Sequence, residues 1–156
     1  EAFASAVAEH GVRRWLTEHK PEDLPKYERW LERKGHFLHL LRQTSNELKT
    51  LYASELDNDE MRSGKQALFN TLIERYAELK EKWNGYDGYD RWFEKPINNA
   101  RLTSIAVYRD RVPDFLRWLE ACENDLPQFY NAMRRLSKLD KPERHRRLLG
   151  EASCSS

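Results

Sequence analysis

The chain has 156 residues, of which 39% are hydrophobic and 34% are charged, enough for one domain with a buried core. Its 27 lysine and arginine residues nearly balance 26 aspartate and glutamate residues, so no overall field favours nucleic acid or an acidic partner. No apolar run approaches the roughly 20 residues that a membrane span needs. We expect residues 1–150 to form a single helical domain or a fragment of a larger one, and residues 151–156 to form a disordered tail.

The first expected helix covers about residues 2–19 and stops before Pro21, because the residue preceding a proline disfavours helical dihedrals. One face of this helix is apolar. The face through Glu1 continues through three small residues, namely Ala4, Ser5 and Ala8. A helix that is apolar nearly all round is typically buried. We therefore expect part of its cover to be missing and the chain to be the C-terminal portion of a larger protein.

Two long helices are expected next. One starts near Pro25, a residue suited to a first helical turn, and the other begins at a capping box formed by Asp57 and Glu60. Apolar residues recur at three- and four-residue steps through both segments. Because only a short polar turn joins them, the pattern predicts an antiparallel helical hairpin over about residues 25–83.

Residues 84–98 contain two glycines and a proline, which predict a loop. We expect four aromatic side chains to hold this loop against the helices: Tyr86, Tyr89, Trp92 and Phe93. Further helices are expected after Pro96, from Pro113, over residues 126–139 and near Pro142. The expected fold is an all-α multi-helix bundle.

The two cysteines form no recognisable framework. Cys122 lies in an expected helix and is interpreted as a small packed side chain, whereas Cys154 lies in the polar tail. The sequence therefore predicts no disulfide between them and leaves the redox compartment undetermined.

Histidines offer one weak metal-binding pattern. His36 and His39 share a helical face with Glu32, but their charged neighbours favour a solvated surface. The chain contains no H-E-x-x-H, Cys-x-x-Cys, glycine-rich phosphate loop or G-x-S-x-G motif. Taken alone, the residues hold no complete catalytic constellation.

A basic stretch follows at residues 134–147, with seven cationic and two acidic side chains. Nucleic acid is one interpretation of such a run. A solvated helical face is favoured, because aromatic residues are not interleaved with the charges.

Several segments together resemble a known family. They are EAFASAVAEHGVRRWL, LYASELDNDEMRSGKQALF, KPINNARLTSIAVYRDRVPDF and FYNAMRRLSKL, which cover nearly the whole chain in order. They resemble the bacterial zinc aminopeptidases of the gluzincin type. The resemblance implies that the expected helical bundle is the C-terminal portion of a larger metallopeptidase fold. Members of that family carry an H-E-x-x-H helix followed by a helix that begins N-E-x-F-A.

The resemblance implies that Glu1, in E-A-F-A, is the third zinc ligand, and that the substrate is a peptide. Two histidines and one carboxylate leave a position open for a water that the metal acidifies. The histidines and the catalytic base lie upstream of Glu1 in the family. The resemblance thus implies a partner, the missing N-terminal part of the same protein, without which this chain is expected to bind no zinc and to be inactive. The same resemblance suggests a bacterial protein that is periplasmic or anchored as a lipoprotein.

Four more residues are nominated for the site. Asn98, Asn99 and Arg101 are candidates for holding the substrate backbone, and Tyr108 for stabilising an oxyanion. Three of these residues have a structural alternative: the two asparagines can cap a helix and the tyrosine can pack in a core. Glu1 likewise can act only on the dipole of its own helix. A non-catalytic helical interaction module is the alternative function.

Overall fold

The structure, a computed structural model, describes residues 1–106 and 111–154, and the side chains of all of these except residues 103–106. Within the described residues the fold is all-α, as predicted, and no strand occurs. A short 3₁₀ turn at Pro21–Asp23 follows the first helix. Eight helices are described: α1 (Ala2–His19), α2 (Leu24–Tyr52), α3 (Asn58–Lys82), α4 (Asp90–Phe93), α5 (Asn99–Ala106), α6 (Val112–Ala121), α7 (Leu126–Ser137) and α8 (Lys141–Leu149).

The chain divides into two compact units. One comprises residues 1–21 and 108–156, and the other residues 22–107. Each has its own hydrophobic core, and each is described below by itself.

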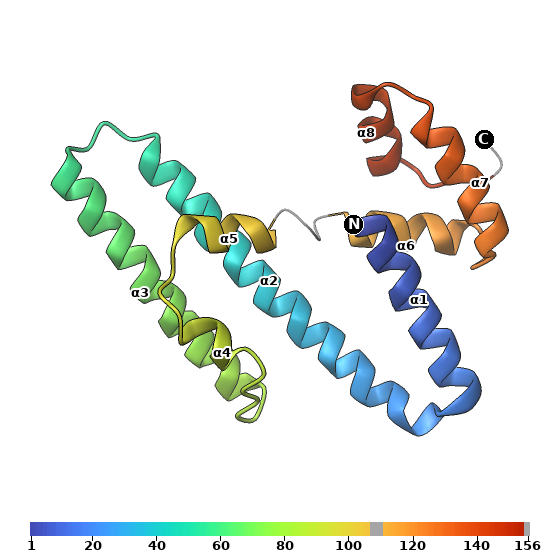
Figure 1. The fold of residues 1–156 in the computed structure, drawn as a ribbon, viewed down its shortest axis with the longest axis horizontal. Coiled ribbons are helices and arrows are strands. Elements are labelled where there is room, and N and C mark those ends of the chain that lie inside the picture. Colours follow the sequence, from blue (N-terminus) through green and yellow to red (C-terminus); the bar gives the residue numbers. More distant parts are fainter. Residues whose placement is uncertain (107–110, 155–156) are drawn as a thin grey trace. The chain divides into compact units, whose positions relative to one another are not determined.

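The hairpin of α2 and α3 forms the larger part of the unit of residues 22–107, and the two helices lie side by side (Figure 1). The predicted capping box is confirmed: the Asp57 carboxylate accepts hydrogen bonds from two backbone N–H groups, and Glu60 accepts from the Asp57 N–H at 3.1 Å. Gly64 permits a close approach of the helices, because a Cβ there would lie 2.8 Å from the Leu51 side chain. Helix α2 ends at Tyr52, before the short polar segment that joins it to α3.

Aromatic side chains hold the loop of residues 84–98 against this hairpin, as predicted. Tyr89 stacks on Phe37 of α2 with ring centroids 4.1 Å apart, and Phe93 stacks on Tyr76 of α3 at the same distance. The single turn of α4, which was not predicted from the sequence, places Asp90 beside α3. Helix α5 then packs on α2.

In the unit of residues 1–21 and 108–156, α1 packs against α6, and α6, α7 and α8 surround a separate core. Phe129 is fully buried at its centre, and Phe3 of α1 stacks on this ring at 5.5 Å. Ala6 is also fully buried, so the apolar face predicted for α1 is the face that packs within this unit.

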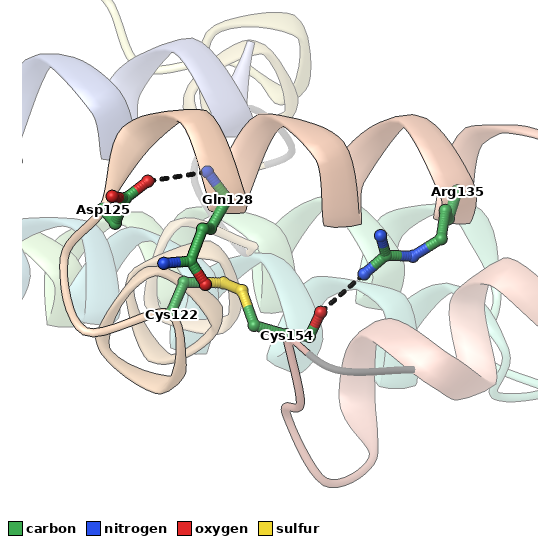
Figure 2. The surroundings of a disulfide bond; sticks show 5 residues. All are labelled: Cys122, Asp125, Gln128, Arg135 and Cys154. Carbon is green, nitrogen blue, oxygen red and sulfur yellow. Dashed lines mark hydrogen bonds between the residues drawn. A yellow bond between two sulfur atoms is a disulfide. The ribbon is translucent and has the colours of Figure 1, made fainter.

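A disulfide joins Cys122, after α6, to Cys154 near the C-terminus (Figure 2). The prediction that these cysteines do not pair was wrong. Their Cα atoms lie 5.2 Å apart, within the usual disulfide range, because the chain after α8 returns to the end of α6. The Arg135 guanidinium donates a 2.6 Å hydrogen bond to the Cys154 carbonyl and holds this return segment on α7.

Candidate functional site

Glu1 stands immediately before the first turn of α1, where its carboxylate is exposed and forms no side-chain cap. Among the described residues, its carboxylate has no hydrogen-bond or ion-pair partner. Phe3, two positions along, anchors the start of the helix by ring contacts to Phe115, Phe129 and Tyr130. An outward-facing carboxylate therefore projects from a firmly packed helix end.

The face of α1 that continues from Glu1 is exposed and largely apolar. Ala4 and Ala8 lie on it, followed one and two turns later by Val12 and Trp15. Val12 is 40% exposed and Trp15 is 48% exposed. The burial expected all round α1 is thus found on one face only.

The two nominated asparagines have structural partners. The Asn98 side chain accepts a 3.0 Å hydrogen bond from the Arg101 backbone N–H, which is the helix-capping role considered as its alternative. The Asn99 amide donates to the Tyr52 hydroxyl at 3.0 Å and thereby ties the start of α5 to the end of α2.

Arg101 holds together the segment that precedes α5. Its guanidinium donates to the backbone carbonyls of Trp92, Lys95 and Pro96. It also lies 4.5 Å from the centre of the Trp92 ring. The guanidinium N–H groups therefore bind the backbone of the chain itself. This structural role of Arg101 was not predicted from the sequence.

The remaining nominated residue, Tyr108, lies outside the described residues. Asn98, Asn99 and Arg101 belong to the unit of residues 22–107, whereas Glu1 belongs to the other. Neither unit by itself brings Glu1 together with the nominated substrate-binding residues.

The unit that contains Glu1 has a cavity of about 700 Å³ between α1, α6, α7 and α8. Its walls include the apolar side chains of Phe3, Phe115, Met133, Leu136 and Leu148. Five basic side chains also line it: Arg111, Arg134, Lys141, Arg144 and His145. Sequence reasoning missed this site, although three-, four- and seven-residue spacing in the basic stretch was the available signal.

A model of the putative aminopeptidase family matches residues 1–148 of the chain. The chain belongs to the putative aminopeptidase family. The match covers residues of both compact units. It includes Glu1, Arg101 with its backbone acceptors, and the residues that line the cavity. No curated protein and no solved structure matches the chain.

A catalytic zinc in this aminopeptidase family member would require three protein ligands close together. His36 stacks parallel to Trp83 and lies 3.4 Å from its indole nitrogen, on a different unit from Glu1. Within residues 1–106 and 111–154, no three His, Cys, Asp or Glu side chains gather as a metal site would require. One exposed carboxylate does not supply the three ligands that catalytic zinc requires.

Across the same described ranges, no helix is long and apolar enough to cross a bilayer.

Proposed function

We propose that this chain is the C-terminal helical part of a zinc-dependent aminopeptidase that acts on peptides. In this proposal Glu1 supplies the third metal ligand, and α1 forms one wall of the substrate cleft. The observation that carries the proposal is the family match over residues 1–148, in which Glu1 opens the chain's E-A-F-A segment. Two histidines and the general base would come from a part of the protein outside this chain.

The geometry of α1 supports this assignment. A metal ligand must be held by well-packed neighbours, because a loosely held carboxylate does not keep its coordination geometry. Phe3 and Ala6 anchor the helix, whereas the Glu1 carboxylate remains available to bind a metal. The small side chains of Ala4 and Ala8 let another helix approach closely on the same face.

The test uses the longest natural form of the protein and compares Glu1→Gln with Glu18→Gln. Glu18 is an exposed carboxylate on the same helix, paired with Arg14 at 2.9 Å, and it is a matched control. We expect Glu1→Gln to lower bound zinc, measured by elemental mass spectrometry, and to reduce hydrolysis of an aminoacyl p-nitroanilide at least a hundredfold. Glu18→Gln should retain both properties. Unchanged zinc content in Glu1→Gln would refute the ligand role.

A non-catalytic interaction module is the second candidate, and the exposure of Val12 and Trp15 on α1 favours it. The natural protein would then carry no stoichiometric zinc and would not cleave the p-nitroanilide. Trp15→Ala would weaken partner binding in that case without any effect on a peptidase activity.

A further inference from the structure

The cavity of about 700 Å³ in the unit of residues 1–21 and 108–156 has an apolar interior. Its size falls within the range of roughly 300–1,000 Å³ that is typical of small-molecule sites. Leu136 and Leu148 are largely buried in its wall, and the rings of Phe3, Phe115 and Tyr130 complete this part of the lining. Transfer of an apolar group of a ligand from water into this interior would lower the free energy.

Helix α8 separates its charged side chains between two faces. Lys141, Arg144 and His145 line the cavity together with Leu148, at the three- and four-residue spacing of one helical face. Glu143 instead pairs with Arg146 and Arg147, and these two guanidinium groups lower the pKa of its carboxyl. The only carboxylate within α8 thus neutralises arginines that do not line the cavity.

Helix α7 contributes a similar face. Tyr130, Met133, Arg134 and Ser137 follow the same spacing and line the cavity. Among the residues that the structure describes, no aspartate or glutamate side chain lines the cavity. Arg111 has Asp114 at 3.5 Å and His145 at 3.0 Å. Within residues 1–106 and 111–154, the cationic groups of Arg134, Lys141 and Arg144 have no carboxylate partner.

We propose that this cavity binds a fatty acid, with the alkyl chain against its apolar wall and the carboxylate at Arg134, Lys141 and Arg144. Three cations without an acidic partner among the described residues surround an apolar interior, which is complementary to one anionic head on one apolar tail. Charge-assisted hydrogen bonds from guanidinium and ammonium groups orient the head. This inference does not depend on the peptidase proposal, because it uses neither Glu1 nor a metal.

The apolar interior is what separates this proposal from nucleic-acid binding through the same basic stretch. A nucleic-acid strand needs cations that track successive phosphates and exposed rings for its bases. Here the arginines and the lysine surround a recess whose wall is largely alkyl and aromatic. A short oligonucleotide is therefore a competitor to be tested.

The experiment measures binding of dodecanoate to the full chain, stripped of bound lipid, by isothermal titration calorimetry below the micelle concentration. Dodecanol tests the tail without the charge, acetate tests the head without the tail, and dodecyl phosphate tests an alternative anionic head. We expect saturable binding of one dodecanoate, at least tenfold weaker binding of dodecanol and no binding of acetate. Equal affinity for dodecanoate and dodecanol, no saturable dodecanoate binding, or tighter binding of dodecyl phosphate or of a single-stranded oligonucleotide would overturn the proposal.

Two double variants provide the matched comparison on the protein. Arg134→Gln with Arg144→Gln removes two cations from the cavity and should weaken dodecanoate binding at least tenfold while leaving dodecanol binding unchanged. Arg146→Gln with Arg147→Gln removes two arginines that Glu143 already neutralises, and it should leave dodecanoate binding within twofold of the original. Circular dichroism confirms folding of both. Ser137→Phe, which fills the cavity from α7, should abolish binding of both ligands; retained dodecanoate affinity in this folded variant would also overturn the proposal.

Discussion

The Asp90 carboxylate accepts hydrogen bonds from two side chains of α3, the Tyr76 hydroxyl at 2.6 Å and the Lys80 ammonium at 2.5 Å. Lys80 first, and Tyr76 second, lower the pKa of the Asp90 carboxyl below its ordinary value. Burial and the hydrogen bond to Asp90 raise the pKa of the Tyr76 hydroxyl. Burial also raises the pKa of Tyr89 to about 12. At the residue scale, the attachment of α4 to α3 therefore depends on the protonation state of the Asp90 carboxylate.

Asp90→Asn should reduce the pH dependence of stability in the acid range. Because the folded-state pKa of Asp90 lies below the unfolded value of about 3.9, its contribution is present above that pH and is lost as pH falls through the folded pKa. Wild type should therefore exceed the variant in stability at pH 7, and the difference should shrink as the pH falls below about 4. Urea denaturation between pH 2 and 7 measures this.

Asp87→Asn, which removes an exposed carboxylate from the same loop, is the control. A difference between wild type and Asp90→Asn that stays constant over this pH range would show that the carboxylate does not contribute through its ionisation.

At the element scale, the helix ends in this chain are set by local chemistry. Asp57, Asp125 and Asp140 each accept a hydrogen bond from a backbone N–H in the first turn of α3, α7 and α8 respectively. A proline stands in the first turn of α2, α6, α7 and α8, where its missing N–H removes no helical hydrogen bond. These signals are readable from adjacent residues, and the helix starts predicted from them are confirmed.

Asp57→Ala should destabilise the hairpin by about 0.5–2 kcal/mol, because it removes the acceptor for the N–H groups of Asp59 and Glu60. Hydrogen exchange at the start of α3 measures the effect locally. Asp59→Asn is the matched control, since its exposed carboxylate pairs with Arg62 at 3.7 Å and caps no backbone N–H among the described residues. Equal protection in the two variants would contradict the capping contribution.

At the scale of the whole molecule, the chain is built around two separate cores. The disulfide belongs entirely to the unit of residues 1–21 and 108–156, where it closes a loop between positions 32 residues apart. Cys122 is 1% exposed in that core, so its side chain packs there as the sequence analysis expected.

Removing the disulfide should therefore destabilise one unit selectively. A closed loop of this length lowers the conformational entropy of the unfolded chain and thereby stabilises the folded unit by about 3–4 kcal/mol. Cys154→Ser should lower hydrogen-exchange protection in α6 and α7 by a corresponding amount and leave α2 and α3 unchanged. Alkylation of the untreated wild-type chain should label neither cysteine. Labelling of both, or equal loss of protection in the two units, would contradict this account.

The sequence by itself determined the helices and the hairpin, because caps, prolines and apolar spacing act between residues a few positions apart. Asn98 illustrates this, since its capping partner is only three residues away. The Cys122–Cys154 pair, the Arg101 clamp and the basic cavity were decided by tertiary structure. Each depends on how the chain folds back. The Arg101 hydrogen bonds form only when the backbone of residues 92–96 lies around its guanidinium, and the cavity forms only when Phe3 lies beside residues 111–148. Short-range sequence patterns do not predict these long-range contacts, because tertiary packing determines which distant faces of the chain meet.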